Sequence, residues 1–212
     1  MFKDLKQKLR KLFEYFIIIP VSKFKWILYK LKHKKIKIII GAGTTKFKGW
    51  FNTDTYNLDV TSSSDFRKLL KDKKIDAVLA EHVLEHLTSE QLDRMIQNFL
   101  NYCHENCNIR IAVPDGYHGN IEYIENVKPN GKGEGAEDHK HLFNYISLSK
   151  LFEKYGFKAN LLEFWDENKE FNTIYKNDDN GIIRRSFLND SRNFEGKPNY
   201  TSLIIDFKRL VK

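Results

Sequence analysis

Short apolar runs alternate with amphipathic stretches along most of the chain. The runs are rich in β-branched residues, which predicts buried strands over Ile36–Ile40, Trp50–Asp54, Ile75–Ala80, Ile109–Val113, Phe157–Phe164 and Thr201–Phe207. Helical spacing predicts helices over 64–70, 89–100 and 147–155, with Ser62–Ser64 and Ser89 as N-caps and Gly156 as a stop. Strands that alternate with helices predict an α/β fold with a doubly wound, mostly parallel sheet covered on both faces.

A long polar segment interrupts this alternation between Asp115 and His139. It is rich in Gly, Asn and charged residues. A loop of this length inside a compact domain is usually either a functional lid or disordered. We therefore expect this segment to be a loop without regular structure, beside any site at the strand ends.

The basic residues are concentrated before the first predicted strand. Residues 1–37 hold 12 of the 36 Lys and Arg but only two of the 28 Asp and Glu. This region therefore has a net charge of +10 and the remainder has −2, although the whole chain has +8. We predict a basic arm over residues 1–35 and one catalytic domain over 36–212. A near-neutral body argues against a nucleic-acid substrate, which would require a positive face around the active cleft.

The arm also shows helical periodicity. Apolar residues share one face and lysines the other; the apolar set is Leu5, Leu9, Leu12, Phe13, Phe16 and Ile17. Such a helix can pack on its own domain, pack on a second copy in a homodimer, or lie on an anionic membrane surface. The longest apolar run, Phe16–Val21, contains Pro20 and is far shorter than the ~20 residues of a membrane span. We predict a cytoplasmic protein, with peripheral contact at the inner membrane surface as an alternative left open.

The two cysteines, Cys103 and Cys107, follow a predicted helix. Neither their number nor their spacing supports a disulfide framework or a closed metal site. Two packed thiols in a reducing cytoplasm are the expectation. His82 and His86 are one helical turn apart, but their order with Glu81 and Glu85 is not that of the zinc proteases, so no metal site is predicted.

Glycines and polar residues gather where the predicted strands end. Gly41-Ala42-Gly43 follows the first strand, Asp54 ends the second, and Glu81, His82 and Asp115 follow later strands. Ligands of open α/β sheets bind at the carboxyl ends of their strands. Glycines allow a ligand to approach the backbone, and an Asp after the second strand can accept hydrogen bonds from ribose hydroxyls.

This pattern serves both NAD and S-adenosylmethionine, and the following residues choose between them. The dinucleotide fingerprint requires a third glycine at the start of a helix that holds the pyrophosphate. Position 46 is Lys, and the connection to the second strand is too short for a full crossover helix. S-adenosylmethionine has no pyrophosphate, so the sequence favours it. A phosphate-binding P-loop is excluded because no Gly-Lys-Ser/Thr follows.

Three segments of the predicted domain carry recognisable motifs: Ile38–Gly43, Gly49–Asp54 and Asp76–Leu87. Together these motifs resemble those of the class I S-adenosylmethionine-dependent methyltransferases. More narrowly, the chain is similar to a bacterial subgroup with the patterns I-G-A-G, G-W-x-N-T-D, E-H-V-x-E-H-L and A-V-P-D-G. That subgroup also carries stretches like Gly135–Lys140 and Tyr200–Asp206. The resemblance covers residues 36–208 and leaves out the arm.

The resemblance implies a role for each cofactor-binding position. The Gly41–Gly43 loop would face the methionine part of the cofactor, and Asp54 the ribose. Asp65 is the candidate for the adenine, while Glu81 and His82 would border the sulfonium. It also implies a Rossmann-like sheet whose last strand runs antiparallel. The short first crossover departs from the broader class, so contacts from residues 44–48 are not carried over.

Methyl transfer requires alignment of the acceptor and, for a hydroxyl acceptor, removal of a proton. The candidate catalytic residues are His82, Asp115 and His139, and the candidate acceptor-binding residues are Tyr117, His118, His141, Arg184 and Arg185. Each histidine has a structural alternative, such as bonding to nearby backbone. The arginines can equally form a solvated face.

The predicted function is methyl transfer from S-adenosylmethionine to a small molecule, such as a sugar or phosphoryl group of cell-surface glycan biosynthesis. An NAD-linked or nucleotide-sugar enzyme with the same fold is an alternative. A non-catalytic relative that binds the cofactor is another. A tRNA or rRNA methyltransferase is disfavoured by the distribution of charge.

Overall fold

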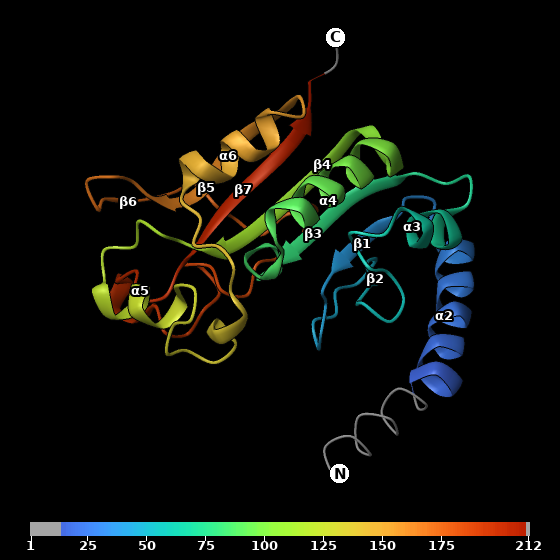
Figure 1. Ribbon diagram of the computed structural model, residues 1–212, viewed down its shortest axis with the longest axis horizontal. Helices are drawn as coiled ribbons and strands as arrows, with labels where there is room; N and C mark the ends of the chain where they lie inside the picture. The colour runs from blue at the N-terminus through green and yellow to red at the C-terminus, as the bar shows by residue number, and fades with distance from the viewer. Residues whose placement is uncertain (1–13, 211–212) are drawn as a thin grey trace.

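The computed structural model describes residues 14–210 of the chain (Figure 1). The helices are η1 Glu14–Ile18, α2 Ile19–Lys32, α3 Ser63–Leu70, η2 Leu84–His86, α4 Ser89–Tyr102, α5 Ile121–Val127, η3 Ala136–Asp138, α6 Tyr145–Glu153 and η4 Phe194–Gly196. The strands are β1 Lys37–Ile40, β2 Phe51–Asn52, β3 Ile75–Glu81, β4 Cys103–Pro114, β5 Phe157–Trp165, β6 Phe171–Thr173 and β7 Ser202–Arg209.

In the described part of the chain the strands form one seven-stranded sheet with the order β2-β1-β3-β4-β7-β5-β6. The first four strands pair in parallel. β7 lies antiparallel between β4 and β5, so β5 runs in the direction of β4. This confirms the predicted mostly parallel, Rossmann-like sheet with an antiparallel C-terminal strand. β1 lies between β2 and β3 in the sheet, so the strands that follow β1 in the chain lie on opposite sides of it. A topological switch point therefore lies at the C-terminal end of β1.

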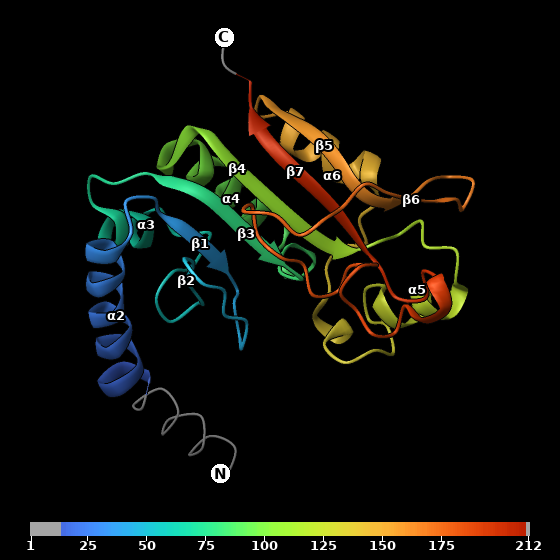
Figure 2. The same cartoon turned by 180° about the vertical axis from the view of Figure 1, so that it is seen from behind.

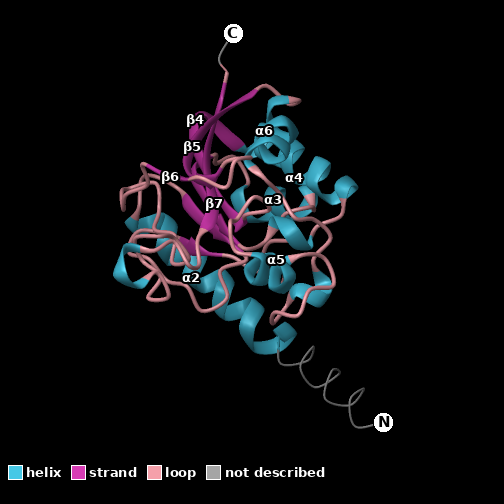
Figure 3. Cartoon of the chain, turned by 90° about the vertical axis from the view of Figure 1, so that its left-hand side faces the viewer, coloured by secondary structure: helices cyan, strands magenta, loops and turns pink. Residues whose placement is uncertain are grey.

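The two faces of the sheet are covered differently. α3, α4 and α6 lie together on one face, as the side view shows (Figure 3). Alternate strand residues such as Val78 and Ile111 form the larger core with these helices. On the opposite face Leu79, Ala112 and Ile204 pack with Tyr175 and Ile183. The covering there is the irregular chain between β6 and β7, which crosses the sheet in Figure 2.

Arg110 fastens this irregular chain to the sheet. Its guanidinium is buried and bonds Asp206 of β7 through Nε (2.7 Å) and Nη2 (2.9 Å). The same group bonds both carboxylate oxygens of Asp178 at 2.8 and 3.1 Å and the carbonyl of Gly181 at 2.6 Å. One side chain of β4 therefore holds β7 and the 178–181 turn at once.

α2 packs at the edge of the sheet beside α3 and β2. Trp26 and Tyr29 are buried, and Trp26 Nε1 donates to the carbonyl of Leu69 at 2.7 Å. Tyr29 contacts Phe51 of β2 ring to ring. No helix in residues 14–210 is both long enough and apolar enough to cross a bilayer. Leu5, Leu9, Leu12 and Phe13, predicted to share an apolar face, lie outside the described residues.

Several element boundaries differ from the predictions. Thr88, not Ser89, caps α4, because its side chain and that of Gln91 form a reciprocal capping box. Asn144 forms a similar box, so α6 begins earlier than expected. The segment predicted as a loop contains α5, capped by Asn120. β6 was not predicted either; it is a three-residue strand that pairs with the end of β5 in a hairpin. Cys103 and Cys107 lie in β4 as free buried thiols.

Candidate functional site

A cavity of about 760 Å³ opens at the C-terminal ends of β1 and β3, at the switch point of the sheet. Its walls come from segments far apart in sequence. They include the Gly41–Gly43 loop, the β3 end from Glu81 to His86, α5 and the 133–139 segment, and Arg184, Arg185, Arg192 and Tyr200. Its volume lies within the range of small-molecule sites.

The Gly41–Gly43 loop turns sharply at the end of β1. Gly41 and Gly43 both have a positive φ, of 58° and 51°, which side chains adopt at a cost. A Cβ on Gly41 would lie 2.6 Å from Cγ2 of Val83, whereas a Cβ on Gly43 would meet nothing within 4 Å. Gly41 is therefore required by packing, and Gly43 leaves the backbone open toward the cavity.

Asp54 is tied to this loop. Gly43 N donates to Asp54 Oδ2 at 3.0 Å, and the backbone N of Asp54 donates to Asn57 Oδ1 at 2.7 Å. Partial burial raises the pKa of the Asp54 carboxyl, although the bond from Gly43 opposes that shift. Asp54 therefore lies beside the glycine loop, as predicted for a residue that would bind a ribose, although it does not itself line the cavity.

Glu81 anchors the arginine segment over the site. Its Oε1 accepts from the backbone N of Arg185 at 2.9 Å and its Oε2 from that of Arg184 at 3.3 Å. The Arg184 side chain stays half exposed, with Nε 3.5 Å from Oε2. A strand-end carboxylate thus fixes the backbone of two arginines that line the cavity.

His82 has a strained backbone at the end of β3. Its φ is 55°, unusual for a residue with a side chain, and such conformations cluster at functional sites. Nε2 lies 3.1 Å from Ser202 Oγ, and Nδ1 lies 3.2 Å from Oε1 of Glu85. The hydroxyl of Ser202 donates in turn to the carbonyl of Arg185. The ring is therefore oriented from two sides within the cavity wall.

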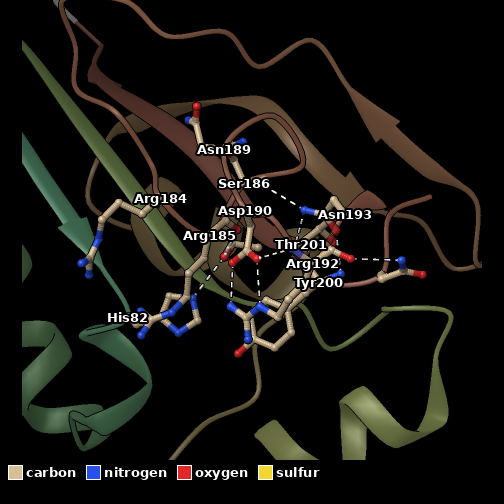
Figure 4. Close-up of polar contacts among 12 residues, drawn as sticks. His82, Arg184, Arg185, Ser186, Asn189, Asp190, Arg192, Asn193, Tyr200 and Thr201 are labelled. Atoms are coloured by element: carbon tan, nitrogen blue, oxygen red, sulfur yellow. Dashed lines mark hydrogen bonds and ion pairs between the residues drawn. The ribbon is translucent and has the colours of Figure 1, made fainter. Parts of the chain in front are cut away.

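Arg192 and Tyr200 complete the wall on the side of β7 (Figure 4). The Arg192 guanidinium makes a bidentate pair with Asp190, at 2.8 and 2.6 Å, and stacks on the Tyr200 ring at 3.2 Å. Asn193 pins the turn, because its amide donates to the carbonyls of Ser186 and Tyr200. Arg192 could not be assigned to the site from the sequence, and Tyr200 entered the sequence analysis only as the first residue of a motif, because the turn brings both residues to the cavity only in three dimensions.

Asp115 does not line the cavity. Its carboxylate is fully buried and accepts from Tyr117 N at 2.9 Å and Trp165 N at 2.8 Å. Burial raises the pKa of Asp115 to about 6. With both oxygens committed to backbone, it holds the ends of β4 and β5 together rather than facing a substrate.

The other predicted residues divide between wall and interior. His139 lines the cavity, with Nδ1 2.7 Å from the carbonyl of Val127. His118 is buried, stacked on Tyr123, and accepts from Asn120 N at Nδ1; burial lowers the pKa of His118 to about 4. His141 packs against Phe143 outside the cavity wall.

Tyr117 and Asp65 also lie away from the cavity wall. Tyr117 contacts Tyr145 and Lys169 on the outer side of the β5–β6 hairpin. Asp65, in the first turn of α3, faces a separate groove between α2 and α3. Neither position offers a contact to a ligand in the main cavity.

No model of a known protein family matches the chain. A search of curated proteins also finds no match. Among solved structures, a SAM-dependent methyltransferase from Archaeoglobus fulgidus is 18% identical, with a TM-score of 0.49 over 90% of this chain and 94% of that one. LepI in complex with SAM is 9% identical, with a TM-score of 0.45 over 91% of this chain and 41% of LepI. A LepI variant with SAH and a substrate analogue aligns similarly, at 9% and 0.45 over 88% and 39%. What this chain does has to be argued from the site itself.

Proposed function

We propose that the chain binds S-adenosylmethionine and transfers its methyl group to a small-molecule acceptor. The observation that carries the proposal is the Gly41–Gly43 loop, held to Asp54 by the Gly43 hydrogen bond at the switch point of the sheet. Open α/β sheets bind their ligands at this position. The bound cofactor would supply an electrophilic methyl group on sulfur.

The residues present fit this cofactor. Gly43 leaves open the space that a side chain would fill, so the methionine part can approach the backbone. Asp54 uses Oδ2 for Gly43, and its second oxygen would accept a hydrogen bond from a ribose hydroxyl. Glu81 and His82 border the same cavity, where both would lie beside the sulfonium, and His82 would receive a proton if the acceptor is a hydroxyl.

The same geometry disfavours the NAD alternative. No helix lies between β1 and β2, so a pyrophosphate would lack the backbone N–H groups of a helix N-terminus. S-adenosylmethionine has no such requirement.

For the acceptor we infer a sugar or phosphoryl compound of cell-surface glycan biosynthesis. Arg184, Arg185 and Arg192 line the cavity beside His82, and arginine forks match the geometry of phosphate and carboxylate oxygens. Glu81 and Asp190 already fix two of these arginines. An acceptor with an anionic group would therefore be positioned without large rearrangement.

Titration calorimetry with S-adenosylmethionine and S-adenosylhomocysteine tests the core of the proposal. We expect binding by the full chain, a loss of about 10- to 100-fold in Asp54→Ala because a charged hydrogen bond is removed, and no binding of NAD. Asp72→Ala is the matched control, because Asp72 is an exposed aspartate in the turn after α3. Absence of binding, or equal affinity in Asp54→Ala, would contradict the proposal.

We also infer that α2 rests on an anionic membrane surface. Its buried residues Trp26 and Tyr29 face the domain. Phe24, Ile27, Leu28 and Leu31 follow the helical spacing of one face and are 49–80% exposed. Lysines lie on α2 around this apolar stripe: Lys23, Lys25, Lys30 and Lys32. An apolar stripe among lysines suits the boundary between acyl chains and acidic headgroups, and it would bring the cavity near membrane-linked acceptors.

A further inference from the structure

Glu85, His86 and His139 form a cluster in the cavity that the proposed function does not use. Each offers one ligand atom, and these atoms all lie within 4.8 Å of one another. Glu85 and His86 belong to η2, directly after β3, and His139 follows η3. All three line the same cavity as the Gly41–Gly43 loop.

The Glu85 carboxylate lacks the partners that a buried charge requires. The side chain is 1% exposed, and within residues 14–210 neither oxygen has a hydrogen-bond partner. His82 Nδ1 lies 3.2 Å from Oε1 without a hydrogen bond, and the two groups form an ion pair only when the imidazole is protonated. An isolated buried carboxylate costs several kcal/mol unless a cation or donors compensate it. A bound cation would supply that compensation.

His139 is oriented as metal-binding histidines usually are. Its Nδ1 lies 2.7 Å from the carbonyl of Val127. A carbonyl only accepts, so Nδ1 carries the proton and Nε2 of the neutral ring keeps its lone pair. Metal-ligating histidines commonly fix their tautomer through such a bond. The His86 ring lies beside it, at 4.7 Å between centroids, with Nδ1 3.6 Å from Asp138 Oδ2.

The backbone holds the two halves of the cluster together. The carbonyl of Glu85 accepts from Lys140 N at 2.6 Å and His141 N at 3.2 Å. These bonds fix the 139–141 segment against η2, so His139 stays beside Glu85 without help from a bound ion. A preformed cluster binds an ion with little loss of conformational entropy.

We propose that Glu85, His86 and His139 bind one divalent transition-metal ion, such as Zn²⁺ or Mn²⁺. Two imidazoles and one carboxylate suit these ions better than Mg²⁺ or Ca²⁺, which prefer oxygen ligands. Three protein ligands leave coordination positions open toward the cavity. If the proposed methyl transfer holds, a hydroxyl or carboxylate oxygen of the acceptor occupies such a position. The ion would then orient that oxygen toward the methyl group and, for a hydroxyl, ease the transfer of its proton to a base such as His82.

Cobalt substitution of the chelator-treated full chain tests this site. We expect one equivalent of Co²⁺ to produce visible d–d absorption that Zn²⁺ displaces, and Zn²⁺ to raise the melting temperature. Glu85→Gln and His86→Ala should lower the affinity at least tenfold. His104→Ala, at an exposed histidine of β4 far along the strand, should leave it unchanged.

A second measurement keeps the test decisive if His86→Ala does not fold. Metal-free Glu85→Gln should be at least as stable as the metal-free parent, because it removes an uncompensated charge. A parent that binds no Co²⁺, or a Glu85→Gln variant that binds it equally well, would overturn the proposal. Titration of S-adenosylhomocysteine into the metal-free chain is independent of the cluster. Its failure would remove the proposed function and leave the metal site standing.

Discussion

Asp115 and Glu163 show how a buried carboxylate can serve the backbone instead of a substrate. Glu163 is 0% exposed, and both of its oxygens accept from Phe187 N, at 2.9 and 3.1 Å. Burial raises the pKa of Glu163 to about 8, with the charge of Asp115 contributing. Asp115 thus joins the residues after β4 to β5, and Glu163 joins the segment that follows Arg184 and Arg185 to β5. Each contact has a cost in stability once the acid ionises.

Glu163→Gln is expected to alter the pH dependence of stability. Because the folded pKa of about 8 exceeds the ordinary value of 4.5, the folded state holds the proton longer, and the parent loses stability as the pH rises from 4.5 to 8. The loss is ~1.4 kcal/mol per unit of raised pKa. Gln imitates the protonated acid, so urea unfolding between pH 5 and 9 should show a flatter profile. Glu153→Gln, at an exposed residue of α6, should keep the parental profile; equal slopes in Glu163→Gln would refute the assignment.

Substitution of the two loop glycines, Gly41 and Gly43, should separate an effect on stability from an effect on cofactor binding. Gly41→Ala combines a positive φ with a clash against Val83, so we expect clear destabilisation, by more than the ~1 kcal/mol of the backbone term alone. Gly43→Ala has the backbone term without the clash, so it should fold and bind S-adenosylhomocysteine at least tenfold more weakly, since its Cβ enters the cavity. Thermal unfolding and calorimetry on both variants measure the two effects. Unchanged affinity in folded Gly43→Ala would show that the cofactor does not approach this loop.

Site residues were predictable where the chain itself fixes their place. Gly41, Gly43, Glu81 and His82 follow strands that apolar runs reveal, so they could be assigned to one edge. Arg192 reaches the cavity only through an irregular turn held by side-chain bonds such as those of Asn193 to Ser186 and Tyr200, and apolar periodicity does not predict such bonds. Other residues that line the cavity were not predicted as site residues, among them Glu85, His86 and Tyr200. Asp115 was predicted to be a site residue because it follows a strand. A strand-end position does not indicate whether a carboxylate faces a ligand or bonds to backbone.

At the scale of elements, the alternation of apolar runs predicted most strands. The helix starts differ from the predictions because Thr88 and Asn144 form the caps. β6 and α5 were missed because β6 depends on pairing with β5, and α5 is short and lies among glycines. The distribution of apolar residues on α2 indicates that this helix binds a partner outside the domain. One face is anchored by Trp26, and the opposite stripe stays exposed.

The α2 stripe should bind acidic vesicles. We expect the full chain to co-sediment with phosphatidylglycerol-containing vesicles but not with phosphatidylcholine alone, and to dissociate as salt rises. Phe24→Ser with Leu31→Ser should weaken binding at least tenfold, since each buried apolar side chain contributes ~1.5–3 kcal/mol. Ile174→Ser is the control, because Ile174 is equally exposed on another segment. If the chain does not bind vesicles and instead dimerises through the stripe, the partner of the α2 stripe is a second copy of the chain.

At the scale of the whole molecule, the site depends on how the irregular chain between β6 and β7 is held on the sheet. This chain delivers Arg184, Arg185 and Arg192 to the cavity, yet it has little regular structure of its own. Arg110 attaches the 178–181 turn of this chain to β4, and neither Arg110 nor that turn lines the cavity. Glu81 and Glu163 hold the segment from Arg184 to Phe187. The general fold could be predicted from the sequence, but this dependence could not, because Arg110 reads as one polar residue in an apolar strand.

Arg110→Met should therefore loosen the site from a distance. The substitution leaves Asp206 buried without its partner, so we expect a loss of ~3–5 kcal/mol in the free energy of unfolding. Asp178 is more exposed than Asp206, so Asp178→Asn should cost less, about 1 kcal/mol. The effect of Asp178→Asn should appear as faster exchange of backbone amide hydrogens across residues 178–192, with little change in β3 and α4. If Asp178→Asn left exchange of that segment unchanged, the covering chain would be held mainly by the Glu81 and Glu163 contacts nearer the cavity, and the arginines would not depend on Arg110 for their position.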